Sequence, residues 1–204
     1  MASAISSVAI SGAVEGLVDE AILRRVVREA GATLAAVHGR NGKDYLRRHL
    51  KGYNAAARTV PWVVLVDLDS DAECAPPFVA SWLPQPAAHM SFRVAVREAE
   101  AWLLADRERI AAFLAVPVSS VPGNADCVVD PKLLIVNLAR GSRRRDIRED
   151  MTPRADSGRL VGPAYSSRLI EFIEGRWRPR VAAQGSDSLR RFRLRVAEMV
   201  GERR

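Results

Sequence analysis

The chain has 204 residues and a formal net charge of +7, with 48% hydrophobic and 27% charged residues. This composition is that of a globular protein with a sizeable core, and it excludes a largely disordered chain. No apolar run reaches the roughly 20 residues of a membrane-spanning helix, and the 2 cysteines and 3 histidines show no zinc-ligand spacing. We therefore expect a cytoplasmic protein with reduced thiols, no signal peptide and no membrane partner.

Strand-like and helix-like segments alternate along the first half of the chain. Apolar residues recur at helical spacing from Leu17 to Ala30, and a continuous, mostly β-branched run leads from Trp62 to Asp67. This order predicts an α/β fold with a mainly parallel sheet flanked by helices. The predicted strands are 4–11, 32–39, 61–67 and 91–96, and the predicted helices are 17–30, 42–58 and 97–114.

The pattern weakens beyond residue 116. Residues 116–131 and 142–163 read as loops, as does the Pro-rich segment before the fourth strand. Further helices are predicted at 132–141, 164–176 and 186–200. We expect residues 1–116 to form the core, with 117–204 as a loop-rich, helical and basic extension packed on the same domain.

The positive charge lies in the last third of the chain. Residues 1–139 contain 14 Lys and Arg against 15 Asp and Glu, whereas residues 140–204 contain 17 against 9. Such a bias indicates either a surface that faces a polyanion or a solvated, Arg-rich helical face. If the polyanion is nucleic acid, the side chains expected to grip its backbone phosphates are Arg143, Arg144, Arg145, Arg178 and Arg180.

Acidic residues follow three of the four predicted strands. Ligands of parallel sheets bind outside these carboxyl ends, and grouped carboxylates repel one another unless a cation neutralises them. Oxygen-seeking Mg²⁺, or Mn²⁺, is the natural cation. Asp67 and Asp69 flank Leu68, so both side chains should point the same way. The expected metal ligands are Glu15, Asp19, Asp67, Asp69 and Glu100, with Glu98 pointing away.

Several of these acids can be explained without a metal. Asp19, in the first turn of a predicted helix, could only complement the helix dipole, and Asp71 and Glu73 could be solvated loop residues. A lone Asp-x-Asp after a strand is a weak signal. Three acidic strand ends in one α/β unit are a much stronger one, because grouped acids mark functional sites.

Three segments, "VEGLVDEAIL", "VVLVDLD" and "REAEAWLLAD", resemble the TOPRIM domain, especially that of OLD-type nucleases and of small TOPRIM-like bacterial proteins. The resemblance covers roughly residues 5–115. It implies a TOPRIM-like fold in which a glutamate follows the first strand, Asp-x-Asp follows the third and a further acid lies downstream. OLD-type enzymes also use a lysine, for which Lys132 in "DPKLL" is the candidate, although it could simply be a cation at a helix start. No GxxxxGK[ST] motif is present, so an ATPase would have to come from a partner protein.

Three functions follow as hypotheses. The first is a Mg²⁺-dependent nuclease on DNA or RNA, with Glu15 and Lys132 as catalytic residues and a role in bacterial defence or as a toxin. The second is a non-catalytic TOPRIM-fold module that binds nucleic acid or protein. The third is a metal-dependent enzyme on a small phosphorylated molecule. The sequence leaves open DNA or RNA, ends or interior, and the oligomeric state.

Overall fold

A computed structural model describes residues 8–69, 71 and 73–201 and divides the chain into two compact units. The sheet unit comprises residues 1–66, 75–94 and 191–204. The helical unit comprises residues 67–74 and 95–190. This division differs from the predicted boundary at residue 116, because the helices at 100–114 belong with those that follow them rather than with the sheet.

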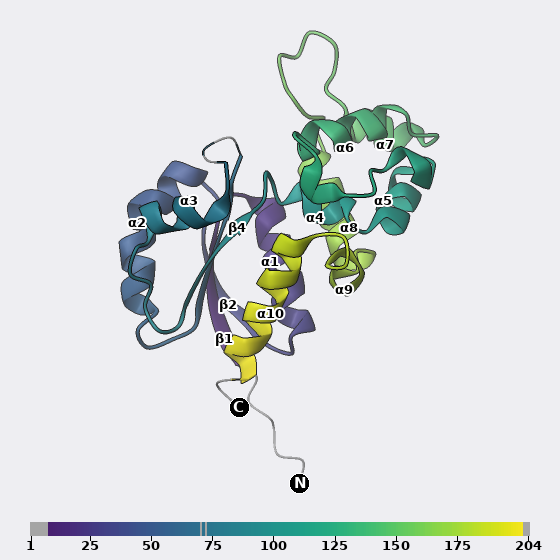
Figure 1. Cartoon of the computed structure of the whole chain (residues 1–204). Helices are drawn as coiled ribbons and strands as arrows, with labels where there is room; N and C mark the ends of the chain where they lie inside the picture. Colours follow the sequence, from purple (N-terminus) through teal and green to yellow (C-terminus); the bar gives the residue numbers. More distant parts are fainter. Residues whose placement is uncertain (1–7, 70, 72, 202–204) are drawn as a thin grey trace. The chain divides into compact units, whose positions relative to one another are not determined.

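The sheet unit contains a four-stranded parallel sheet in the order β2-β1-β3-β4 (Figure 1). Its central strand β3 is buried on both faces, with Val63, Val64 and Leu65 fully inaccessible. This double burial accounts for the unbroken apolar run that the sequence shows there. The strands are β1 (Ala9–Val14), β2 (Thr33–Gly39), β3 (Trp62–Asp67) and β4 (Met90–Ala95), of which the last residues of β3 and β4 already belong to the helical unit.

Helices cover both faces of this sheet. α2 (Lys43–Ala56) and α3 (Ala75–Trp82) lie on one face, and α1 (Leu17–Glu29) lies on the other with the later part of α10 (Asp187–Gly201) (Figure 1). An ion pair between Arg193 Nε and Glu29 Oε2, at 3.1 Å, joins α10 to α1. The predicted fold class, a parallel α/β sheet flanked by helices, is therefore confirmed.

The end of β2 requires a glycine. Gly39 has φ +91°, and a Cβ atom there would lie 2.2 Å from the carbonyl oxygen of Val14. Only a residue without a side chain allows β1 and β2 to approach so closely. This contact fixes the end of β1 immediately before Glu15, whose carbonyl accepts the backbone N–H of Gly42 at 3.1 Å.

The helical unit packs around large aromatic side chains. Trp102, Trp177, Phe113 and Phe172 are fully buried. The indole N–H of Trp177 donates to the carbonyl of Trp102 at 3.2 Å, so the polar atom of this buried side chain has a hydrogen-bond partner. The helices are α4 (Glu100–Leu104), α5 (Arg107–Leu114), α6 (Pro131–Arg140), α7 (Arg145–Met151), α8 (Tyr165–Gly175) and α9 (Pro179–Ala182), with 3₁₀ turns at Val118–Ser120 and Ala125–Cys127.

Several predicted elements are wrong in extent. The first strand runs over Ala9–Val14 instead of 4–11, and residues 4–7 fall outside those that the structure describes. The Pro-rich loop contains α3, because Pro76 and Pro77 occupy the first helical turn, where no backbone donor is needed. The polar loop at 142–163 contains α7, whose apolar pattern, Ile147 and Met151, is too short to detect.

The predicted helix at 97–114 is two helices. The break lies at Asp106, between α4 and α5. The carboxylate of Asp106 is fully buried and accepts hydrogen bonds from Arg178. Within the described residues, no helix is long and apolar enough to pass through a bilayer.

Candidate functional site

The ends of β3 and β4 continue into a hydrogen-bonded connection in the helical unit. The N–H of Leu68 donates to Ala95 O at 2.9 Å, and the N–H of Asp69 donates to Arg97 O at 2.7 Å. Asp69 and Arg97 both have positive φ, at 50° and 64°, which is uncommon for residues with side chains. Such strained positions cluster at functional sites. Because Asp69 lies beyond the strand in this conformation, the alternation that would align it with Asp67 does not apply.

Asp67 is held by the helix that follows β4. Its Oδ1 accepts the backbone N–H of Ala99 at 2.8 Å, immediately before α4 begins at Glu100. The first N–H groups of a helix have no partner within the helix, so this carboxylate satisfies one of them. Asp67 therefore has a structural role in addition to any chemical one.

Lys132 connects the two glutamates that follow β4. Its Nζ lies 2.7 Å from Glu98 Oε1 and 3.8 Å from Glu100 Oε1. The backbone N–H of Lys132, in the first turn of α6, also donates to Glu98 Oε2 at 2.9 Å. The expectation that Glu98 points away from the other acids is therefore wrong: its two oxygens accept the backbone N–H and the ammonium of Lys132, which also lies near Glu100.

The charge of Lys132 is set by these neighbours. Burial alone would lower the pKa of Lys132, but the negative charge of Glu100 and the hydrogen bond and charge of Glu98 outweigh it. The charge of Asp67 acts in the same direction, so the pKa lies above its ordinary value. Lys132 is consequently an ammonium group at neutral pH, and it neutralises part of the acidic cluster.

Tyr165 is a member of the cluster that the sequence did not reveal. It begins α8, is 3% exposed, and its hydroxyl donates to Glu100 Oε1 at 3.5 Å. Burial, followed by the charges of Glu100 and Glu98, raises the pKa of Tyr165 well above its ordinary value, so the hydroxyl stays a donor. No spacing in the sequence connects a tyrosine with acids about 65 positions earlier, and only the fold brings them together.

The other two predicted ligands belong to the sheet unit. Glu15 directly follows β1 and is partly buried. Asp19 lies in the first turn of α1, and its Oδ2 accepts the backbone N–H of Gly16 at 2.8 Å. Asp19 thus accepts a backbone N–H at the N-terminus of α1, where a negative charge also complements the helix dipole. That Glu15 and Asp19 share a metal with the acids of the helical unit stays a prediction.

The donor chemistry of the cluster, which consists of Asp67, Glu98, Glu100, Lys132 and Tyr165, suits a hard cation. Across the described ranges of the chain, no three His, Cys, Asp or Glu side chains are grouped so as to enclose a metal ion. Magnesium, however, takes only one or two carboxylates and fills its other positions with water and substrate oxygens. Asp67 and Glu100 can supply such ligands, whereas Glu98 is engaged by Lys132.

Two of the three arginines at 143–145 are paired with carboxylates of α7. Arg144 binds Asp146 through both its Nε and Nη2 atoms, and Arg145 Nε lies 2.7 Å from Glu149 Oε1. Arg145 starts a helix, so the predicted loop at 142–163 does not include it. Arg143 is exposed.

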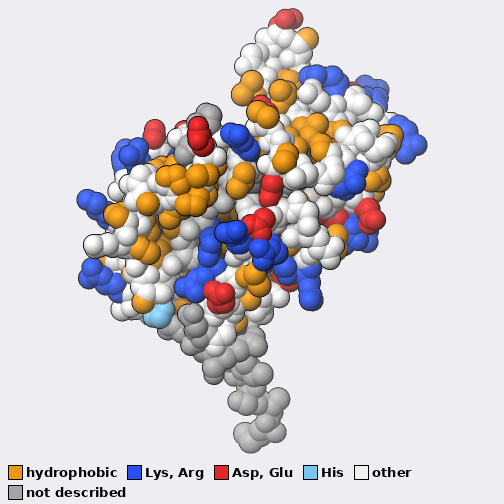
Figure 2. Space-filling model, in the orientation of Figure 1, with side chains coloured by type: hydrophobic (Ala, Val, Ile, Leu, Met, Phe, Trp, Pro, Cys, Tyr) orange, Lys and Arg blue, Asp and Glu red, His pale blue; other side chains and the backbone are white. Residues whose placement is uncertain are grey.

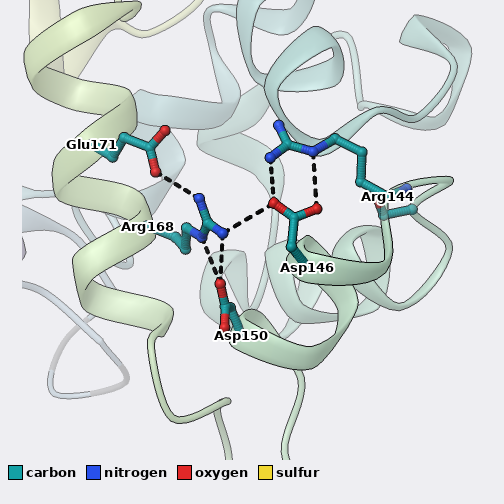
Figure 3. A network of polar contacts seen from close by, with 6 residues as sticks. Arg144, Asp146, Asp150, Arg168 and Glu171 are labelled. Atoms are coloured by element: carbon teal, nitrogen blue, oxygen red, sulfur yellow. Dashed lines mark hydrogen bonds and ion pairs between the residues drawn. The ribbon is translucent and has the colours of Figure 1, made fainter.

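Arg144 is also part of a larger network within the helical unit (Figure 3). Arg168 of α8 reaches Asp146 at 3.0 Å, Asp150 at 2.7 Å and Glu171 at 2.9 Å. This network ties α8 to α7, so Arg144 has a structural role whether or not it meets a phosphate.

Arg178 and Arg180 differ in their surroundings. Arg178 Nη2 lies 2.6 Å from Asp106 Oδ1 and 3.0 Å from Glu108 Oε2. Its guanidinium neutralises a carboxylate with no exposed surface. Arg180 of α9 is exposed. On this basis Arg143, Arg145 and Arg180 are the better placed of the predicted phosphate contacts.

An open hollow of about 510 Å³ lies at the end of α7. Arg148, Glu149, Thr152, Pro153 and Arg154 line it. Arg148 donates to the carbonyl of Ser142 at 2.5 Å, which holds its guanidinium against the helical unit. The hollow contains none of the clustered acids.

Comparison of the chain with protein-family models, with characterised proteins and with solved structures finds no significant match.

Proposed function

We propose that this chain is a cytoplasmic, Mg²⁺-dependent phosphodiesterase of TOPRIM type that cleaves DNA or RNA. The observation that carries the proposal is the cluster of Asp67, Glu98 and Glu100 with Lys132 at the carboxyl ends of β3 and β4. Ligands of parallel sheets bind at such ends. Carboxylates that can hold a metal, with a lysine beside them, also match the chemistry of phosphate cleavage, in which cations stabilise the negative charge on the reacting phosphate.

Each residue of the cluster has a distinct task in this proposal. Asp67 and Glu100, with Glu15 and Asp19 of the sheet unit, would hold the metal, which supplies an activated water and stabilises the leaving oxygen. Lys132 offsets charge on the phosphate, because its ammonium persists at neutral pH. Tyr165 orients Glu100 through its hydroxyl. Glu15 lies directly after β1, where it would act on the water.

Substrate binding is assigned to exposed arginines of the helical unit. Arg143, Arg145 and Arg180 would contact backbone phosphates without reading sequence. An enzyme of this kind suits bacterial defence or a toxin, alone or with a partner that supplies an ATPase.

A second candidate, a non-catalytic module that binds nucleic acid or protein, is favoured by a specific observation. Asp67, Glu98 and Asp19 each accept a backbone N–H at the start of a helix, and Lys132 neutralises Glu98. These contacts explain the charge balance of the cluster without any metal.

The test is cleavage of labelled single- and double-stranded DNA and RNA in Mg²⁺, Mn²⁺ or EDTA, with wild type, Asp67→Asn and the exposed control Asp156→Asn. Cleavage that requires metal and falls by orders of magnitude in Asp67→Asn alone supports the enzyme, since a lost metal-centred effect costs several kcal/mol. Nucleic-acid binding without cleavage by any preparation supports the binding module. Metal-dependent hydrolysis of a generic phosphodiester, without cleavage or binding of nucleic acid, points to a small phosphorylated substrate.

The variant must stay folded for this comparison to decide. An asparagine Oδ1 can still accept the N–H of Ala99, so the melting temperature of Asp67→Asn should stay close to that of wild type. A variant that melts much lower while keeping normal specific activity would remove Asp67 from the catalytic assignment.

A further inference from the structure

Helix α2 of the sheet unit carries an excess of positive charge. Its cationic residues are Lys43, Arg47, Arg48 and Lys51. Its acid, Asp44, lies in the first turn, where a carboxylate complements the helix dipole. By contrast, α1 on the other face of the sheet contains three acids and three arginines. The imbalance is therefore a property of α2 and not of every helix that covers the sheet.

Three of these cations form one group on the exposed side of α2. Arg47, Arg48 and Lys51 are all exposed. Lys51 is four residues after Arg47 and three after Arg48, so the three side chains are neighbours on the helix surface. Figure 2 shows Lys and Arg side chains along the side of the sheet unit where α2 runs in Figure 1. Like charges at this spacing repel one another, and a bound anion would relieve that repulsion.

Aromatic rings flank this group of cations. Arg47 Cζ lies 5.5 Å from the centroid of the Trp82 ring in α3, a cation–π contact. Tyr45 and His49 lie on the opposite flank of α2, and their rings stack with centroids 4.1 Å apart. His49 is exposed, whereas Tyr45 and Trp82 are half-buried. The rings are therefore held in place while part of their surface stays accessible.

A run of exposed charge is ordinarily a solvated face, but two observations favour a ligand here. The first is that Arg47 contacts a ring and Arg48 Nε donates to the carbonyl of Asp44 at 3.3 Å, neither of which neutralises a cation. The second is that cations and accessible rings are the two groups with which proteins hold a single strand, because cations follow the phosphates and rings stack on the bases. The bases of a duplex are stacked on one another and would not reach these rings.

We propose that one surface of the sheet unit, the α2 face, binds single-stranded nucleic acid. The α2 face consists of Tyr45, Arg47, Arg48, His49, Lys51 and Trp82. Its cations contact backbone phosphates and its rings stack on bases, an interaction that accepts any base and gives no sequence preference. The proposal goes beyond the proposed function, which assigns phosphate contacts to arginines of the helical unit, and it does not require cleavage.

The test uses the full chain, the variant R48Q/K51Q and the control R28Q/R109Q. All four positions are exposed, and glutamine is a good helix former, so both variants should fold. Arg28 lies on α1 and Arg109 on α5, so the control removes the same charge from other surfaces. Circular dichroism checks the fold. The single variant Lys51→Gln, with half the expected change in slope, replaces the double variant if the latter unfolds.

The first measurement is the anisotropy of labelled single-stranded oligonucleotides over a salt series. For R48Q/K51Q the salt slope should fall by about 1.4, at about 0.7 per lost contact to a single strand, which weakens binding about 25-fold near 0.1 M salt. R28Q/R109Q should bind as wild type does. EDTA is present throughout, so a chain without any nuclease activity still gives a decisive result.

The second measurement is the quenching of tryptophan fluorescence by an unlabelled single strand. Trp82 is half-buried, whereas Trp62, Trp102 and Trp177 are buried, so a ligand of the α2 face should quench Trp82 in particular. Trp82→Phe should lose the quenching, because phenylalanine keeps an aromatic ring at this position but emits little light. A duplex of the same sequence should quench less than the single strand.

Several results would overturn the proposal. One is an affinity and a salt slope of R48Q/K51Q that equal those of wild type, and another is an equal loss in R28Q/R109Q. Quenching that persists in Trp82→Phe, or a loss of duplex affinity as large as that for single strands, would do the same. Binding to phosphatidylserine vesicles that requires Arg48 and Lys51, with oligonucleotide binding unchanged, would assign the α2 face to an anionic membrane instead.

Discussion

Lys132 is the cation around which the acids of the helical unit are arranged. It contacts Glu98 through its ammonium and its backbone N–H, and Glu100 lies 3.8 Å from the same ammonium. Glu100 is only 4% exposed, and both this ammonium and the hydroxyl of Tyr165 face its carboxylate. Each of these residues constrains the position of the others.

Replacing this lysine should destabilise the protein. Lys132→Met leaves Glu98 and Glu100 without their cation, and loss of one partner of a buried pair costs about 3–5 kcal/mol. Because Lys132 is 38% exposed in its side chain, solvent screening reduces the expected loss to about 1–2 kcal/mol. Thermal melting measures it, and Lys51→Met, an exposed lysine of α2, should change little.

The loss of stability caused by Lys132→Met should not vary with pH across the neutral range. The pKa of Lys132 is raised in the folded state, so its contribution is complete below its ordinary value of 10.5 and is lost only as pH rises through the higher folded value. The difference in melting temperature between wild type and Lys132→Met should therefore be flat from about pH 6 to 9. A difference that fades toward pH 9 would mean that the ammonium is not held as the structure has it.

At the scale of elements, two glycines allow the cost of an unfavourable backbone conformation to be compared with the cost of a steric clash. Gly39 ends β2 and Gly42 precedes α2, and both have positive φ, at 91° and 79°. A Cβ at Gly39 would meet Val14 O at 2.2 Å, whereas at Gly42 nothing lies within 4 Å. The two glycines therefore share a positive φ and differ in the space around the backbone.

Gly42→Ala should lower the free energy of unfolding by about 1–3 kcal/mol, because its φ of 79° with ψ of 177° is a conformation essentially confined to glycine. Gly39→Ala should lower it by clearly more, because the β1–β2 backbones must also separate. Urea denaturation of the two variants gives both values. Equal losses would show that the end of β1 yields easily, and would weaken the idea that it holds Glu15 in place.

The arginines around the start of α7 give a second prediction for elements. Arg144 belongs to the network of Asp146 and Arg168, so Arg144→Ala should lower the melting temperature as well as remove a charge. Arg143→Ala should leave stability almost unchanged, since surface substitutions usually fall within about 0.5 kcal/mol. If Arg143 contacts a duplex phosphate, its loss should reduce the salt slope of binding by about 0.9. An unchanged slope assigns Arg143 to solvation.

At the scale of the whole molecule, the question is whether acids of the two units share one ion. Glu15 belongs to the sheet unit and Asp67 to the helical unit. If they bind the same Mg²⁺, wild type should melt higher with Mg²⁺ than with EDTA, and Glu15→Gln and Asp67→Asn should each remove most of that rise. Residues that act through one ion are not additive, so the double variant should lose hardly more than either single one.

Wild type, the two single variants and the double variant form a double-mutant cycle, in which the measured quantity is the Mg²⁺-induced rise in melting temperature. The exposed control Asp156→Asn should keep the full rise. Independent losses for Glu15→Gln and Asp67→Asn would place the two acids at separate sites, and the TOPRIM interpretation would lose its central requirement.

The sequence by itself determined the class of the fold and the places where acids follow strands. The run before Asp67 is apolar on both faces because β3 is the buried centre of a parallel sheet, and periodicity reports burial directly. The helices α1, α2, α6 and α8 agree with prediction to within one or two residues for the same reason. It also singled out Lys132, although not its partners.

Only the tertiary structure decided which side chains meet. Tyr165 and Lys132 reach Glu100 because separate helices of one unit converge on it, and such contacts between distant positions leave no local pattern in the sequence. Burial also separates the roles of two nearby arginines. Arg178 forms an ion pair with the inaccessible carboxylate of Asp106, whereas Arg180, two residues later, faces solvent. Composition counts both charges equally, but the free energy of a charge depends on the water and the opposite charges that surround it.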